Sequence, residues 1–159
     1  MENLIDEICA LIEKLELKSE DFEKKDRTPG VKAPAHDKVV NAIRDFWEGK
    51  YPFIQEYSAH GIDYVGRKLS QGPIELAVEV DEGWWRARDS VMKLADIRAN
   101  LKVWINISNK ENSGKDFDRA LKDIQTILKI RNETKETFGN FLVFLKTPNP
   151  KVFKKIRIF

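Results

Sequence analysis

Residues 73–108 read PIELAVEVDEGWWRARDSVMKLADIRANLKVWINIS, and this stretch decides the fold. Within it, 74–81 is rich in apolar residues that recur at every second position, which is typical of a strand. Residues 85–99 mix charged and apolar side chains in the manner of a helix, and 101–107 again resembles a strand. A helix of this length between two strands favours a crossover connection, so we expect the two strands to be parallel.

Two carboxylates lie toward the carboxyl end of the first of these strands. Strand side chains alternate between faces, so Glu79 and Asp81 share one face, and Glu75 lies on the same face further down the strand. In open α/β sheets, functional groups gather at the carboxyl ends of the strands. Glu79 and Asp81 are therefore either part of a functional site or an ordinary charged strand face.

The flanking segments predict further elements of one compact α/β domain. With 159 residues, of which 42% are hydrophobic, the chain is long and apolar enough for a single core. The additional predicted elements are a helix at 36–47, strands at 53–58 and 62–67 joined by a hairpin turn, a helix at 116–131 and a strand at 141–145. The last of these is continuously apolar, which indicates a strand covered on both faces.

The N-terminal segment has an amphipathic helix of its own. Apolar residues recur at helical spacing in 4–15, and 24–35 contains two prolines and a glycine and is interpreted as a linker. The apolar stripe either docks on its own domain or joins two chains, and the linker favours a homodimer. The predicted division of the chain is an N-terminal helix and linker at 1–34, the main domain at 35–148, and a basic C-terminal tail or edge strand at 149–159.

Composition excludes several classes of protein. The formal charge of +2 does not by itself mark a nucleic-acid-binding protein. The single cysteine, Cys9, cannot form an internal disulfide, which favours a reducing compartment, and we expect a cytoplasmic protein. No apolar run is long enough to predict a membrane span. The phosphate-loop, dinucleotide-binding, zinc-protease and nucleophile-elbow motifs are also absent from the sequence.

Asp63 lies in the sequence GIDY of the second predicted strand, and Glu79 and Asp81 lie in AVEVD of the third. With the order of elements, this pattern resembles the PD-(D/E)xK nuclease-like superfamily over residues 36–148. The resemblance implies a restriction-endonuclease-like fold, which is a three-layer α/β/α core with a mixed sheet in αβββαβ order. It also implies phosphodiester hydrolysis with Mg²⁺, or Mn²⁺ in its place, on nucleic acid, with DNA as the expected substrate.

The resemblance assigns roles to individual residues. Asp63, Glu79 and Asp81 would be metal ligands, and Mg²⁺ does prefer carboxylate and water oxygens. Asp81 stands where the family has its lysine, so another cation is needed near the phosphate. Lys93, on the helix after the third strand, is the first candidate for this catalytic role. Arg67, which shares a strand face with Asp63, is the second.

Two other interpretations are compatible with the same residues. The missing lysine is also expected of a catalytically inactive member that binds nucleic acid or protein. An unrelated small α/β interaction domain would explain the charged strand face without any site. Trp84 and Trp85 resemble a base-stacking pair, but tryptophans at the start of a helix more often pack against the protein.

Overall fold

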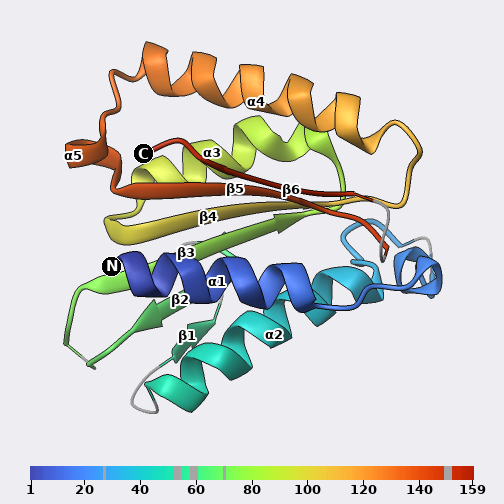
Figure 1. Cartoon of the computed structure of the whole chain (residues 1–159), viewed down its shortest axis with the longest axis horizontal. Coiled ribbons are helices and arrows are strands. Elements are labelled where there is room, and N and C mark those ends of the chain that lie inside the picture. Colours follow the sequence, from blue (N-terminus) through green and yellow to red (C-terminus); the bar gives the residue numbers. More distant parts are fainter. Residues whose placement is uncertain (27, 52–54, 58–60, 70, 149–151) are drawn as a thin grey trace.

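The computed structural model describes residues 1–26, 28–51, 55–57, 61–69, 71–148 and 152–159. A mixed sheet lies between two helical layers, with α1 and α2 on one side and α3 and α4 on the other (Figure 1). The helices are α1 (Glu2–Lys14), α2 (Pro34–Lys50), α3 (Ala87–Asp96), α4 (Ser113–Ile130) and α5 (Lys135–Phe138), with 3-10 turns η1 (Ser19–Phe22) and η3 (Trp84–Arg86). The strands are β1 (Gln55–Tyr57), β2 (Tyr64–Arg67), β3 (Ile74–Asp81), β4 (Ala99–Ile107), β5 (Asn140–Lys146) and β6 (Phe153–Arg157).

The six strands follow one another across the sheet in chain order. β1, β2 and β3 form an antiparallel meander, and β4 is added parallel to β3 through α3. β5 is added parallel to β4 through α4, and β6 returns antiparallel along β5. The predicted α/β class, the mixed sheet and the parallel crossover are therefore confirmed. The predicted strand 53–58 is described only as β1, and its hairpin turn lies outside the described residues apart from Gly61.

Side-chain alternation divides the core into two halves. Leu76, Val78 and Val80 of β3 face α1 and α2, where they join one apolar cluster. Ala77 of the same strand faces α3 and α4 and belongs to the other cluster, with Trp104 of β4. Glu79 continues the Ala77 face, so the strand period directs its carboxylate into the layer between the sheet and α3.

Helix α1 docks on the sheet of its own chain. Ile8 and Ile12 are fully buried in the same cluster as the apolar residues of α2 and β3–β5. Lys146 of β5 donates to the carbonyl oxygen of Glu13 over 2.8 Å, which anchors the end of the helix. Of the two alternatives for this stripe, the structure shows docking on the chain's own sheet, and it gives no support for a homodimer contact.

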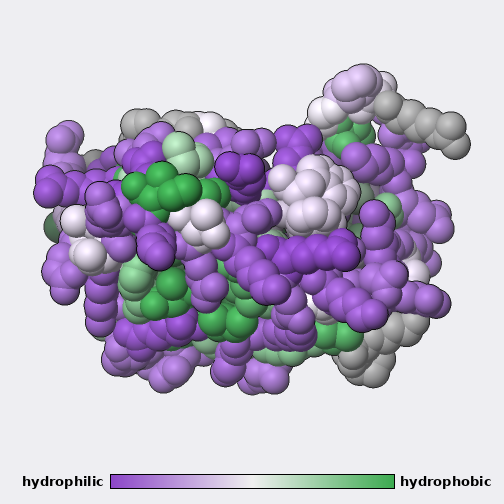
Figure 2. All heavy atoms as spheres, turned by 90° about the horizontal axis from the view of Figure 1, so that it is seen from above, coloured by the Kyte–Doolittle hydropathy of each residue, from purple (hydrophilic) through white to green (hydrophobic). Residues whose placement is uncertain are grey.

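The predicted linker and C-terminal segment both join the domain. Ala33, directly before α2, donates its backbone N–H to the carboxylate of Glu82, and Lys24 lies 3.4 Å from the same side chain. The predicted basic edge strand is confirmed as β6, at one border of the sheet. The face over α4 carries mostly hydrophilic side chains (Figure 2). No helix among the described residues combines the length and apolar character needed to cross a membrane.

Candidate metal and phosphate site

The candidate site lies at the carboxyl end of β3, against helix α3. Glu79 and Asp81 are only 2% and 4% exposed, so both carboxylates are withdrawn from water. Ser90 of α3 is buried between them, and its hydroxyl donates to Asp81 Oδ2 and lies 3.3 Å from Glu79 Oε2. One buried serine thus links both predicted ligands, as expected for alternate residues on one strand face.

Asp81 has a second donor inside the protein. The indole Nε1 of Trp104, on β4, lies 2.7 Å from Asp81 Oδ2. The Trp104 ring is itself held, because it stacks on Phe117 of α4 with ring centroids 6.3 Å apart. A buried carboxylate that accepts from two donors is stabilised where it stands. Asp81 therefore acts first as a structural acceptor that joins β3 to α3 and β4.

Glu79 has a cationic partner at the protein surface. Lys93 Nζ lies 3.4 Å from both oxygens of Glu79, and the lysine side chain is 45% exposed. The pKa of Glu79 is raised to about 7: burial is the largest cause, the charges of Asp63 and Asp81 add to the rise, and Lys93 opposes it. Glu79 therefore changes its charge near neutral pH when no metal is present.

Asp63 reaches the same end of β3 from the residue before β2. Its Oδ2 accepts a 2.8 Å hydrogen bond from the backbone N–H of Val80, and its Oδ1 lies 3.3 Å from Nε2 of His36 in α2. Nε2 is not aligned for a hydrogen bond, so this contact is an ion pair when the imidazole is protonated. Burial disfavours the charged form of both groups, but the attraction between them outweighs this effect. The pKa of His36 is therefore raised and the pKa of Asp63 is lowered.

The three predicted ligands meet at one end of the sheet without forming a closed ligand set. Among the described residues, no group of three or more His, Cys, Asp or Glu side chains is placed to hold a metal ion. Asp81 is turned to Ser90 and Trp104, whereas Asp63 and Glu79 remain close enough for one charge to affect the other. Carboxylate oxygens completed by water are the donors that Mg²⁺ prefers, so the chemistry of this pair suits the ion.

Arg67 does not join this cluster. In the pairing of β2 with β3 it lies opposite Ile74, at the start of β3, while Glu79 is near the end of that strand. Its guanidinium donates to the carbonyl oxygen of Gly72 in the turn between the strands. The structure does not bring Arg67 to the carboxylates, because residues that share a strand face can lie at its opposite ends. Lys93 alone of the two predicted cations lies at the site.

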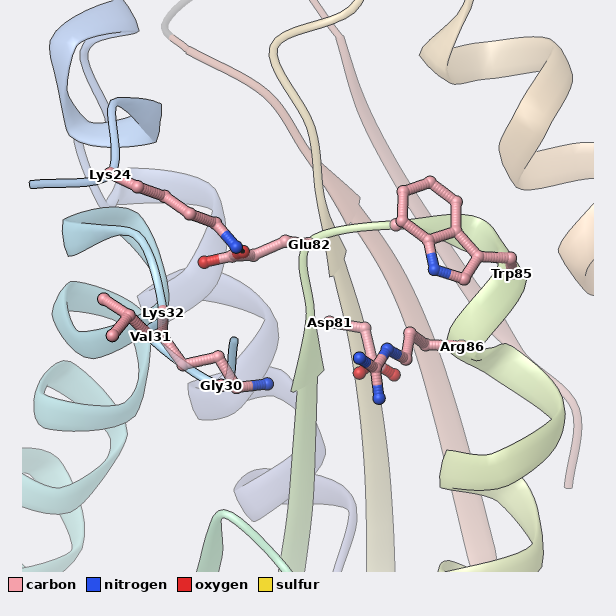
Figure 3. A pocket seen from close by; sticks show the side chains of 9 residues that line it. Lys24, Gly30, Val31, Lys32, Asp81, Glu82, Trp85 and Arg86 are labelled. Atoms are coloured by element: carbon pink, nitrogen blue, oxygen red, sulfur yellow. Dashed lines mark ion pairs between the residues drawn. The ribbon is translucent and has the colours of Figure 1, made fainter. Parts of the chain in front are cut away.

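A pocket of about 120 Å³ opens beside the cluster at the end of β3. Figure 3 shows the chain before α2 on one side, with Lys24 and Lys32, and the turn η3 that leads into α3 on the other, with Trp85 and Arg86. Asp81 lines this pocket and also belongs to the carboxylate cluster. Asp81 is thus the member of the cluster that borders the pocket, and cationic side chains border the same pocket.

Comparison of the chain with protein-family models, with curated proteins and with solved structures gave no match. The geometry of the site is therefore the basis for assigning a function. Its contacts also include three side chains that sequence reasoning did not place there, which are His36, Ser90 and Trp104. The spacing of Ser90 and Lys93 on one stripe of α3 was a signal for the serine. No local pattern points to the other two.

Proposed function

We propose that this protein is a Mg²⁺-dependent, nuclease-like protein that hydrolyses phosphodiester bonds of nucleic acid. The observation that carries the proposal is the position of Glu79, a buried carboxylate between Asp63, directly before the neighbouring strand β2, and Lys93 from the following helix. The order α2, β1, β2, β3, α3, β4 supports a restriction-endonuclease-like core around it.

Each side chain has a role that follows from its surroundings. Asp63 and Glu79 would hold Mg²⁺ or Mn²⁺, which supplies a Lewis acid for the phosphate and a water of lowered pKa. The Val80 N–H and the imidazole of His36 fix the orientation of the Asp63 carboxylate. Lys93 is exposed enough to turn toward a phosphate oxygen and takes the place of the lysine that Asp81 replaces.

A second function is favoured by the environment of Asp81. The position that carries a lysine in the active family is occupied here by a buried carboxylate, which Ser90 and Trp104 hold in place. Such an exchange removes a cation from the site, and the residue in its place has a structural role as a hydrogen-bond acceptor. The alternative is therefore a catalytically inactive nuclease fold that binds nucleic acid or protein.

A cleavage assay separates the two functions. Plasmid DNA, single-stranded DNA and RNA are incubated with the protein in Mg²⁺, in Mn²⁺ and in EDTA. We expect metal-dependent cleavage that Asp63→Asn and Glu79→Gln abolish and Lys93→Gln reduces. Glu75→Gln is the matched control, because Glu75 lies on the same face of β3 at its other end, beside Asn100. Cleavage that persists in Glu79→Gln would refute the assigned site.

If no cleavage is seen, the effect of metal on the melting temperature separates an inactive metal-binding protein from one without a metal site. A ligand that binds only the folded state raises the melting temperature. A rise in Mg²⁺ without cleavage would support the inactive module. If the wild-type protein shows neither cleavage nor a rise in melting temperature, the metal site does not exist and the proposal is wrong.

A further inference from the structure

An exposed tryptophan stands at the mouth of the pocket beside the cluster. Trp84 is half-buried and packs against the core, as the sequence predicts, but its neighbour Trp85 is 56% exposed. The packing expected of Trp85 is therefore incomplete. In Figure 3 its indole lies at the edge of the pocket, above the end of β3. An aromatic ring held at a pocket and open to solvent is a surface for stacking.

Gly83 positions this ring. A Cβ atom at Gly83 would lie 2.3 Å from Cη2 of Trp85 and within 2.6 Å of two further ring carbons. The indole therefore lies directly against the backbone of Gly83, which no other residue type would allow. The ring keeps one defined place while much of its surface remains exposed, so stacking on it costs little ordering of the side chain.

The charges around the ring favour an anion. Lys32 and Arg86 line the pocket and are exposed, and neither forms an ion pair with any residue that the structure describes. Lys110 Nζ lies over the Trp85 ring, 5.2 Å from its centre, on an exposed side chain that a stacking base would displace. The carboxylates in the lining are already engaged: Ser90 and Trp104 donate to Asp81, and Lys24 and the Ala33 N–H bind Glu82.

We propose that this pocket binds one unpaired nucleotide, with the base stacked on Trp85 and the phosphate held by Lys32 and Arg86. Aromatic platforms flanked by cations are the usual means of binding single strands, because every base offers a ring face. In a duplex the neighbouring pairs cover these faces. The substrate class is therefore single-stranded nucleic acid. The inference that this strand is cleaved rests on the proposed function, since Ser90 links Asp81, which lines the pocket, to Glu79.

Binding without metal tests the pocket separately from hydrolysis. Fluorescence anisotropy in EDTA compares a labelled single strand with the duplex of the same sequence. We expect the single strand to bind at least about 10-fold more tightly. Trp85→Ala should weaken single-strand binding by about 10-fold, and Trp85→Phe should restore most of it. Gly83→Ala should act like Trp85→Ala, because its methyl group displaces the ring.

The salt dependence of binding measures the contribution of the cationic side chains. Arg86→Gln and Lys32→Gln should each weaken binding. Each should also reduce the slope of log K against log salt concentration by about one, the value expected for one lost phosphate contact. Lys122→Gln, which removes an exposed charge from α4, is the control and should change neither. Circular dichroism checks the fold of each variant.

Equal affinity for single strand and duplex, or an unchanged affinity in Trp85→Ala, would overturn the inference. Binding of an added protein in place of nucleic acid would also overturn it. Single-strand binding that depends on Trp85, in a protein that cleaves nothing, would support the pocket and reject hydrolysis.

Discussion

Replacement of Glu79 by glutamine should change how the stability of the metal-free protein depends on pH. Burial raises the pKa of Glu79 from 4.5 to about 7. A carboxyl group whose pKa is higher in the folded state binds its proton more tightly there. The stability that it contributes is complete below about pH 4.5 and is lost as the pH rises through about 7.

The pKa shift sets the magnitude of this effect. Between pH 5 and pH 8, the Glu79 contribution to the free energy of unfolding should fall by about 2–3 kcal/mol. The neutral amide of Glu79→Gln lacks this contribution, so the variant should be at least as stable as the wild-type protein at pH 8. Loss of the Lys93 contact subtracts little, because that lysine is 45% exposed. His36 also has a raised pKa, but it is present in both proteins and cancels in the comparison.

Urea unfolding in EDTA, followed by tryptophan fluorescence from pH 5 to pH 8, measures the difference. Glu75→Gln, which removes a carboxylate from the other end of the same strand, is the control. If Glu79→Gln keeps the wild-type slope, the carboxylate is not perturbed and the electrostatic account of the site fails. Mg²⁺ at pH 8 should raise the melting temperature of the wild-type protein and leave that of Glu79→Gln unchanged.

Three further substitutions test other parts of the structure. Trp104→Phe removes a donor from the buried Asp81 carboxylate and should lower the free energy of urea unfolding by about 1–3 kcal/mol. Ile8→Ala should cost about 2–5 kcal/mol in the same assay, because α1 docks on its own sheet, and a negligible loss would contradict that docking. Burial lowers the pKa of Lys102 to about 8, so the contribution of Lys102 to the stability of the wild-type protein should rise by about 2 kcal/mol from pH 8 to pH 10; Lys102→Met should lack this contribution.

The sequence predicted those parts of the fold that follow from local periodicity. The alternation in 74–81 and the β-rich run in 101–107 indicated β3 and β4, and the helical pattern between them required a parallel crossover. Helical spacing also placed Lys93 beside Glu79, since one turn of α3 separates it from Ser90. In these cases the geometry of one element, or of one strand and the next helix, was sufficient to predict the position of the residues.

Contacts between distant segments were not predictable in the same way. Trp104 donates to Asp81 across 23 positions of sequence, and nothing in the local pattern of either strand indicates that bond. Arg67 was placed by its strand face, but its register opposite Ile74 puts it at the far end of β3. The apolar stripe of α1 looks the same whether it covers a sheet or a second chain, so only the packing of Ile8 shows which surface it meets.

The central claim is that Asp63 and Glu79 hold one divalent cation, and a crystal structure with Mn²⁺ tests it most directly. Mn²⁺ replaces Mg²⁺ in oxygen-rich sites and is located by its anomalous scattering. The account predicts one anomalous peak bonded to a carboxylate oxygen of each residue, with Lys93 beside it and Asp81 still bound to Ser90. A crystal soaked in millimolar Mn²⁺ with no peak between Asp63 and Glu79 would contradict the claim.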